Sequence, residues 1–140
     1  MVGITVSELM EKARGLLQIE CLTGDPTGRR PITTSDVHRP GLALVGFLEN
    51  FLWERVLVFG ATEIVYLRRL SEEKVREALA PILNFDLPCI LVSKKLDPPA
   101  PLLEMARERG IPVLRTTLAT TEFIHKLQDF LEGLFAPTTT

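Results

Sequence analysis

The sequence predicts a single-domain α/β fold with a largely parallel sheet built from βαβ units. From residue 55 onward, short β-prone apolar runs alternate with segments of helical periodicity, which is the order of βαβ units with right-handed crossovers. The apolar runs are continuous, as expected for parallel strands covered on both faces. The length of 140 residues suits one domain with its own hydrophobic core.

The N-terminal third is predicted to be a helix followed by a pair of strands. Thr5 and Glu8 have the spacing of a capping box, and the apolar residues after them share one helical face. Residues 17–22 alternate between apolar and polar, which favours a half-buried strand. The turn at 23–28, with its Gly, Asp and Pro residues, would then reverse the chain into a second strand at 30–34.

The central elements are predicted from continuous apolar runs and a helix cap. The runs at 56–59 and 88–92 are expected to be strands buried on both faces. A helical segment fits residues 62–70. Ser71 is a suitable N-cap for the next helix, whose apolar stripe extends to Ile82.

The C-terminal elements are one more βαβ unit and a long amphipathic helix. Residues 102–109 are predicted to be a helix that ends at Gly110. The strand at 111–114 contains a proline, which predicts an edge position. Thr120 or Thr121 would cap the last helix, whose apolar positions fall on one face. These positions are Phe123, Ile124, Leu127, Phe130, Leu131 and Leu134.

Composition and charge narrow the class of protein. Apolar residues make up 46% of the chain and charged residues 24%, which is typical of a folded soluble domain. The net charge is −2, so the basic excess on which nucleic-acid binding depends is missing. The apolar runs are far shorter than the roughly 20 residues of a membrane span, and charged residues interrupt the N-terminus. We expect a cytoplasmic protein that binds neither nucleic acid nor membrane.

Arg39, Pro40 and Gly41 form the best candidate for a binding turn. Pro40 fixes φ, and Gly41 permits a positive φ or a close backbone approach. Arg39 would then present a planar guanidinium suited to carboxylate or phosphate. The alternative is a structural ion pair between Arg39 and Glu63 or Asp36, and such pairs are commoner than ligand sites.

The histidines and cysteines are expected to have structural rather than catalytic or metal-binding roles. Ser35, Asp36 and His38 are the residue types of a nucleophile, an acid and a base, but neighbours in an extended segment point to opposite faces. A stand-alone hydrolase is therefore the least supported hypothesis. His38 is expected to be a partly exposed loop residue, and His125 a boundary residue of the last helix.

The two cysteines, Cys21 and Cys89, have no companion ligands at zinc spacing. They are expected to be small buried thiols.

Motifs that hold phosphate in enzymes, and the nucleophile elbow of serine hydrolases, are missing from this sequence. No Gly-Lys pair occurs, so there is no P-loop, and neither G-x-G-x-x-G nor G-x-S-x-G is present. Residues 60–63 follow the first buried strand, where α/β folds bind ligands, although Glu63 in the first helical turn opposes an anion there. We assign no catalytic, cofactor-binding or metal-binding residue within the chain.

Five segments resemble the N-terminal domain of the HPr kinase/phosphorylase family. They are SDVHRPGLALVGF (35–47), RVLVFGATEIVYL (55–67), DLPCILVS (86–93), GIPVLRTTLATTEFI (110–124) and LFAPTTT (134–140). The resemblance implies a three-layer α/β domain similar to the N-terminal domain of the Mur ligases. It also implies a bacterial parent enzyme of the phosphotransferase system, which phosphorylates and dephosphorylates a serine of HPr in carbon catabolite repression.

The resemblance implies a division of labour along the parent polypeptide. Residues 1–134 would be the N-terminal domain, and residues 135–140 the start of the hinge to a P-loop kinase domain that binds ATP and Mg. The parent would be a homohexamer with HPr as its partner. The present chain would be a non-catalytic regulatory or assembly domain, or alternatively a module that senses a nucleotide sugar or a sugar phosphate.

The candidate ligand or interdomain contacts are His38, Arg39, Pro40, Gly41 and Glu63. At position 38 the family more often has asparagine.

Overall fold

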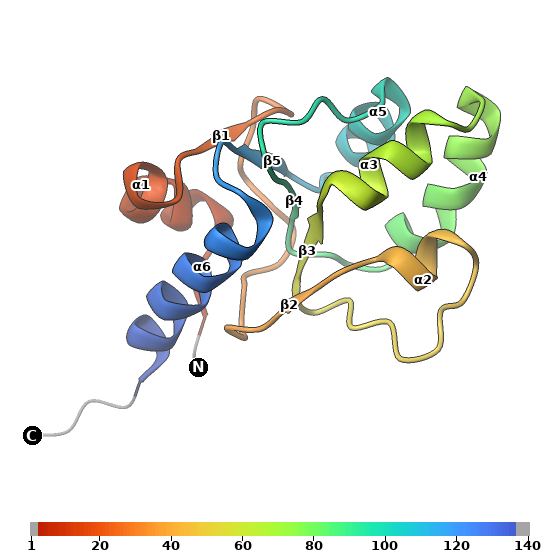
Figure 1. Cartoon of the computed structure of the whole chain (residues 1–140). Helices are drawn as coiled ribbons and strands as arrows, with labels where there is room; N and C mark the ends of the chain where they lie inside the picture. Colours follow the sequence, from red (N-terminus) through yellow and green to blue (C-terminus); the bar gives the residue numbers. More distant parts are fainter. Residues whose placement is uncertain (1–2, 137–140) are drawn as a thin grey trace, which may run out of the picture.

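A five-stranded sheet forms the middle layer of the computed structural model, which describes residues 3–136 (Figure 1). The strands are β1 (Ile19–Cys21), β2 (Val37–His38), β3 (Val56–Phe59), β4 (Ile90–Val92) and β5 (Val113–Thr116). The helices are α1 (Val6–Leu17), α2 (Gly41–Leu44), α3 (Ala61–Arg68), α4 (Glu72–Leu83), α5 (Ala100–Arg109) and α6 (Thr120–Phe135). The α/β class with a mostly parallel sheet is confirmed.

The order of the strands explains how the helices are distributed. The sheet runs β1-β5-β4-β3-β2, with β2 to β5 mutually parallel and β1 antiparallel to β5. Each parallel strand lies beside its successor, so right-handed crossovers place all the connecting helices on one face. Helices α2 to α5 pack on that face, and α1 and α6 cover the other (Figure 1).

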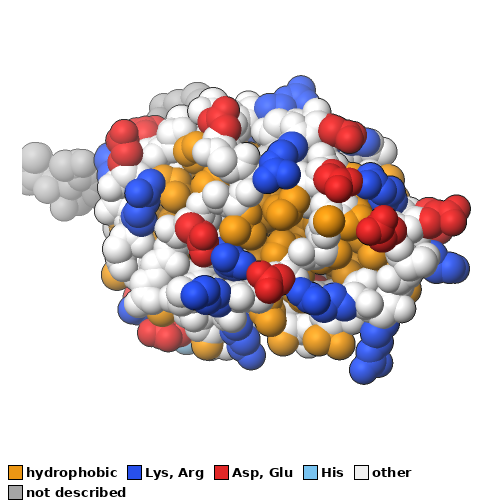
Figure 2. Space-filling model, turned by 90° about the horizontal axis from the view of Figure 1, so that it is seen from above, with side chains coloured by type: hydrophobic (Ala, Val, Ile, Leu, Met, Phe, Trp, Pro, Cys, Tyr) orange, Lys and Arg blue, Asp and Glu red, His pale blue; other side chains and the backbone are white. Residues whose placement is uncertain are grey.

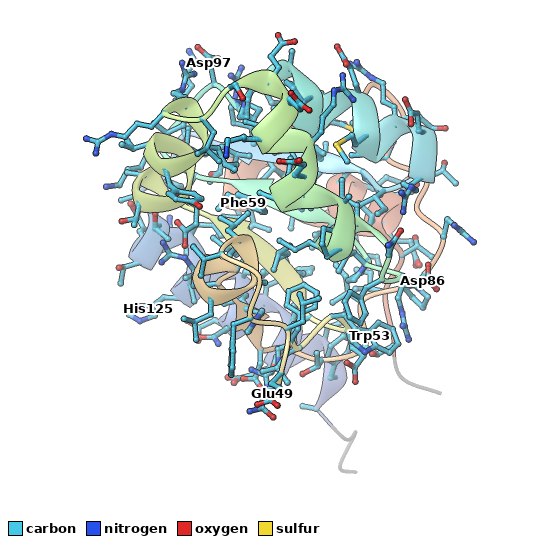
Figure 3. All side chains as sticks on the ribbon, turned by 90° about the vertical axis from the view of Figure 1, so that its right-hand side faces the viewer. Glu49, Trp53, Phe59, Asp86, Asp97 and His125 are labelled. Atoms are coloured by element: carbon cyan, nitrogen blue, oxygen red, sulfur yellow. The ribbon has the colours of Figure 1, made fainter. Side chains whose placement is uncertain are left out.

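Several local predictions are confirmed. All residues of β3 and β4 are buried, and Phe59 lies in the centre of the molecule beneath the helices (Figure 3). The hydroxyl of Thr5 accepts the backbone N–H of Glu8 at 3.1 Å, and the Glu8 carboxylate accepts the N–H of Thr5 at 3.1 Å, completing the capping box. Gly110 ends α5 in the left-handed conformation with φ 69°.

The predicted edge position of the strand at 111–114 is wrong, because β5 lies between β1 and β4. Its proline, Pro112, comes before the first paired residue of the strand. The Pro112 carbonyl accepts the N–H of Ile90 at 2.9 Å, so the missing donor of proline does not interrupt the ladder.

The predicted strand pair in the N-terminal third is also wrong. Ile32 forms only an isolated bridge with Ile4, through backbone hydrogen bonds of 2.8 and 2.9 Å. The backbone groups of Ile32 therefore bond to Ile4, just before the N-cap of α1, rather than to β1. The chain continues to the opposite edge of the sheet, where β2 pairs with β3.

The last helix differs from its prediction at both ends. Ala119 is the N-cap of α6, and Thr120 is the first residue of the helix. Leu134 is exposed, whereas the earlier apolar positions are buried or half-buried. His125 is exposed and points outward (Figure 3), so it does not belong to the boundary of the apolar face. Of the proposed hinge, residues 137–140 lie outside the described residues.

Both cysteines are free thiols in the sheet region. Cys89 is fully buried, and burial raises the pKa of its thiol to about 12. Cys21 is half-buried, with its sulfur 3.3 Å from the Thr23 hydroxyl. Within residues 3–136 no three His, Cys, Asp or Glu side chains gather as a metal site would require, and no helix is long and apolar enough to cross a membrane.

Replacing Thr116 by valine is expected to destabilise the protein by about 2 kcal/mol, since two buried backbone groups would lose their partner. The buried Thr116 hydroxyl donates to the Leu17 carbonyl at 2.6 Å and accepts the Leu118 N–H at 3.1 Å. Urea unfolding followed by circular dichroism measures the change. The control is Thr117, the exposed neighbour of Thr116. Thr117→Val should change the free energy of unfolding by less than about 0.5 kcal/mol. Equal losses in the two variants would contradict this explanation.

Candidate functional site

The carboxyl ends of the parallel strands hold all the buried polar side chains found in residues 3–136. These side chains are Glu63, Ser93, Thr116 and Thr120. Thr116 ends β5 and Ser93 directly follows β4, while Glu63 and Thr120 lie in the first turns of α3 and α6, the helices that follow β3 and β5. In an open α/β sheet this is the edge where ligands bind, so it is the candidate functional site.

Arg39 and Glu63 form a bidentate ion pair at this edge. Arg39 Nε donates to Glu63 Oε2 at 3.1 Å, and Arg39 Nη2 donates to Glu63 Oε1 at 2.8 Å. The Glu63 side chain is 5% exposed and the Arg39 side chain 43% exposed. The carboxylate is therefore withdrawn from water, while part of the Arg39 side chain remains exposed to solvent.

The pKa of Glu63 reflects two opposing effects. Burial raises it, but the hydrogen bonds from Arg39 and from the backbone, together with the Arg39 charge, outweigh burial and leave it below the ordinary value. One of those backbone bonds is the Gly60 N–H, 2.8 Å from Oε1, which lies at the N-terminus of α3. Glu63 therefore caps its own helix and neutralises Arg39 at the same time.

Gly60 and two hydroxyls complete the cluster. A Cβ on Gly60 would lie 2.7 Å from Arg39 Nη2 and 3.1 Å from Thr120 Oγ1, so glycine is needed for space. Its φ of −100° is open to any residue. The hydroxyls of Ser93 and Thr120 are hydrogen-bonded at 2.6 Å. We call Arg39, Gly60, Glu63, Ser93 and Thr120 the carboxyl-edge cluster.

The carboxyl-edge cluster joins segments that are distant in the sequence. Arg39 precedes α2, Glu63 lies in α3, Ser93 follows β4 and Thr120 starts α6. Its carboxylate and hydroxyl groups have partners within the cluster, so its chemistry is that of a clamp between elements. The outer edge of Arg39 is the part of the cluster that can meet an anion or another protein.

Among the alternatives left open for Arg39, the ion pair with Glu63 is the one that forms. Asp36 instead faces Arg55, at 3.8 Å. His38 lies in β2 rather than in a loop, and its ring meets the edge of Phe51 with centroids 5.3 Å apart. Burial, and to a smaller extent the Arg55 charge, lower the pKa of His38. Asp36 and His38 thus have different partners and do not form the arrangement of a triad.

Pro40 and Gly41 lie at the start of the short helix α2. Pro40 is buried and is the N-cap residue of α2, a short helix that the sequence analysis missed. Gly41 is exposed, its φ is not positive, and no atom would lie within 4 Å of a Cβ there. The prediction of a positive φ or a close approach at Gly41 is therefore wrong. The close approach occurs at Gly60.

Ser93 and Thr120 were not predicted as site residues. Ser93 directly follows the predicted strand at 88–92, which is the position where α/β proteins place functional side chains. The position of Ser93 in the sequence was therefore a signal that could have identified it as a site residue. Thr120 was one of the two residues, with Thr121, expected to cap α6, and nothing local in the sequence shows that its hydroxyl faces Ser93.

The face seen from above in Figure 2 carries charges of both signs around exposed apolar atoms. Asp97 lies at the top of the molecule in Figure 3 and so belongs to this face. Its carboxylate accepts from Arg115 at 2.8 Å, and Arg115 also pairs with Glu20 at 3.1 Å. The charge of Arg115 is therefore neutralised locally by these two carboxylates.

Comparison with protein families and curated proteins gives consistent matches. The family model described as "HPr Serine kinase N terminus" matches residues 4–131. The chain is 38% identical over 139 residues to the HPr kinase/phosphorylase of Shouchella clausii strain KSM-K16, and 35% identical to that of Bacillus cereus strain B4264. Each match covers 99% of the chain and 44% of the relative, so the chain spans less than half of their length.

One solved structure has a similar fold. It is the structure of the CBS and DRTGG domains of the regulatory region of Clostridium perfringens pyrophosphatase, complexed with its activator diadenosine tetraphosphate. The TM-score is 0.58 with 10% sequence identity, over 96% of this chain and 51% of that one. At this identity the likeness concerns the fold.

Replacing Glu63 by glutamine is expected to reduce the free energy of unfolding by about 1–2 kcal/mol at neutral pH, since Arg39 loses its charged partner but is screened by solvent. The pKa of Glu63 is lowered in the folded state, so its stabilisation is present above the unfolded value of 4.5 and is lost as pH falls through the folded value. The difference between the wild type and the variant should therefore shrink in acid.

Urea unfolding between pH 7 and pH 3 measures this dependence. Glu122→Gln is the control, because the Glu122 carboxylate pairs with Lys126 on the surface, at 3.6 Å within α6. A Glu63→Gln effect that stays constant over this pH range would argue against a stabilising carboxylate.

Proposed function

The chain belongs to the family of HPr serine kinase N-terminal domains, and from this we propose that it is the non-catalytic regulatory and assembly domain of an HPr kinase/phosphorylase. The whole enzyme would phosphorylate and dephosphorylate a serine of HPr in the cytoplasm, in carbon catabolite control. ATP and Mg would bind to a P-loop domain that follows the segment 135–140. Residues 1–134 would form the domain and residues 135–140 the start of the hinge.

The observation that carries this proposal is the match of the family model to residues 4–131, nearly the whole chain. The relatives named HPr kinase/phosphorylase are more than twice as long as the chain, so their activity belongs to a longer protein. The carboxyl-edge cluster supports a structural role. A general base needs a carboxylate that can reach a substrate proton, whereas both oxygens of Glu63 accept from Arg39.

The partners in this proposal are the P-loop domain of the same polypeptide, HPr through the whole enzyme, and the other subunits of a homohexamer. The exposed edge of Arg39, with His38 and Pro40 beside it, would contact a ligand or a neighbouring domain. Gly41 would begin the short helix that presents this contact, and Glu63 would hold Arg39 in place.

A fusion experiment tests the regulatory role. We expect the 140-residue chain alone to transfer no phosphate from ATP to HPr. When it replaces the matching segment of a relative's HPr kinase/phosphorylase, the fusion should phosphorylate HPr, and Arg39→Ala should alter its response to effectors or its assembly. The catalytic part without an N-terminal domain is the control. Phosphate transfer by the chain alone would overturn the proposal.

A second candidate function is a sensor of a nucleotide sugar or a sugar phosphate. It is favoured by the fold shared with a regulatory region whose structure was solved with the activator diadenosine tetraphosphate. A cavity of about 160 Å³ beside α2 is lined by His38, Arg39 and Phe47, among others, so Arg39 borders a hollow. A phosphate could be held by Arg39 there.

A thermal-shift screen tests the sensor role. Millimolar sugar phosphates, nucleotides and UDP-sugars are expected to raise the melting temperature by about 3 °C or more if one of them binds well above its Kd. Arg39→Ala should abolish that shift. A flat screen would leave the assembly role as the better account of this domain.

A further inference from the structure

A hollow of about 280 Å³ lies at the amino ends of the parallel strands, at the edge of the sheet opposite to the carboxyl-edge cluster. Its lining comes from the ends of α4 and α5 and from the chain between β1 and β2. Figure 3 shows one of its residues, Asp86, at the right-hand margin, away from Asp97 at the top. We call this the amino-edge hollow. Its lining includes Arg29, Leu83, Phe85, Asp86, Arg109 and Ile111.

Arg109 is held at the amino-edge hollow in a fixed position. Its Nη1 donates to the Leu83 carbonyl at 2.9 Å and to Asn84 Oδ1 at 2.6 Å, at the C-terminal end of α4. Its Nε and Nη2 make no hydrogen bond within residues 3–136. These are the same two atoms with which Arg39 binds a carboxylate at the other edge of the sheet. Arg109 is therefore ready to bind a carboxylate through two parallel hydrogen bonds.

Arg29 adds a second positive charge to the hollow. The stem of its side chain lies against Gly110, where a Cβ would come within 3.3 Å of Arg29 Cδ. The absence of a side chain at Gly110 therefore leaves room for this stem. Arg29 is exposed and forms no ion pair with a carboxylate of residues 3–136. Two guanidinium groups with free donors thus line the same hollow.

Asp86 supplies a negative charge to the same hollow. It lies between α4 and β4, is exposed, and has no ion-pair partner in the described part of the chain. Its carboxylate and the two guanidinium groups therefore line one hollow without pairing with one another. A ligand that has both a negative and a positive group can lie between them and give each charge a partner.

The rest of the lining is largely apolar. Leu83 and Ile111 are buried and belong to the hydrophobic core. Phe85 is half-buried and packs against Phe51, with ring centroids 5.0 Å apart. An apolar group that enters the hollow can therefore be withdrawn from water against fixed side chains.

We propose that the amino-edge hollow binds a free α-amino acid with an apolar side chain. The carboxylate of the amino acid accepts hydrogen bonds from Arg109 and Arg29, and its ammonium group donates to Asp86. Its side chain packs on Phe85 and Ile111. The hollow is slightly smaller than the roughly 300–1,000 Å³ of pockets for drug-sized ligands, which suits a compound of this size. The site lies at the opposite edge from the cluster around Glu63 and does not depend on the function proposed above.

The charges around the hollow favour an amino acid over a phosphate compound. The C-terminal ends of α4 and α5 both lie here, and the partial negative charge of a helix C-terminus opposes an anion. Asp86 opposes it as well. A phosphate monoester carries close to two negative charges. A carboxylate carries one, and the ammonium group of the amino acid neutralises Asp86.

Thermal-shift measurements with charge-deleted analogues test the proposal. The probes are L-leucine, L-methionine and L-phenylalanine. We expect at least one of them at about 20 mM to raise the melting temperature of the 140-residue chain by about 3 °C or more. Each probe has two analogues, the acid without the ammonium group and the amine without the carboxylate. For leucine these are isocaproate and isoamylamine. The analogues, and glycine, should each give less than about 1 °C, because one contact is missing.

Titration of the strongest probe, followed by amide NMR signals, tests the assigned residues. Asp86→Asn and Arg29→Gln should each weaken binding at least about tenfold, because each removes a charged contact. The matched controls are Asp129→Asn on α6 and Arg14→Gln on α1, in the other layer, and they should leave the Kd unchanged. All four positions are exposed, so each variant is expected to fold, which circular dichroism checks.

Four results would overturn the proposal. The first is no thermal shift with any of the three amino acids, and the second is an equal shift with an analogue that lacks one charge. The third is unchanged binding in either Asp86→Asn or Arg29→Gln. The fourth is loss of amino-acid binding in Arg39→Ala, which would move the site to the carboxyl edge. These experiments measure neither phosphate compounds nor HPr phosphorylation, so their failure leaves both functions proposed above untouched.

Discussion

The carboxylate of Glu63 is buried, and the elements around it supply the charge and the hydrogen bonds that compensate for its lost hydration. Burying an isolated carboxylate costs on the order of several kcal/mol, which Arg39 and the Gly60 N–H offset. This requirement constrains the backbone nearby. Arg39 must follow β2 directly so that its side chain reaches α3, and a side chain on Gly60 would collide with the guanidinium. One buried charge thus determines where two helices start.

Helix caps and apolar runs in the sequence predicted most helices and strands, but they did not predict which strands pair. The cap at Thr5, the cap at Ser71 and the buried runs at 56–59 and 88–92 depend on neighbours in sequence, and the structure has them. The position of β5 inside the sheet and the route from residue 34 to β2 depend on which strands meet in space. Such pairings involve contacts between distant residues, which periodicity does not report. The Arg39–Glu63 pair was among the alternatives because charge and strand ends suggested it, while the Ser93–Thr120 contact had no local signal.

Helix α3 joins the candidate site to the solvent-exposed side of the molecule. It carries Glu63 on its inner side and Val65 on its outer side, within a single turn. A partner that packs on the outer side would therefore press on the same short helix that holds the ion pair. Rigid elements of this kind are the physical means by which two sites influence each other. The sequence predicted this helix, but its evenly distributed apolar residues did not indicate which side faces the core.

The thiol of Cys89 offers a natural reporter for the integrity of the sheet. Only a thiolate reacts readily with alkylating reagents and oxidants, and a thiol with a pKa of about 12 and no exposure is almost never ionised or accessible at neutral pH. Its labelling therefore waits for the core between the sheet and helices α1 and α6 to open. Mass spectrometry after timed alkylation would register how often the centre of the molecule opens, without any engineered label. The half-buried Cys21 on the outermost strand would register fraying of that edge in the same sample.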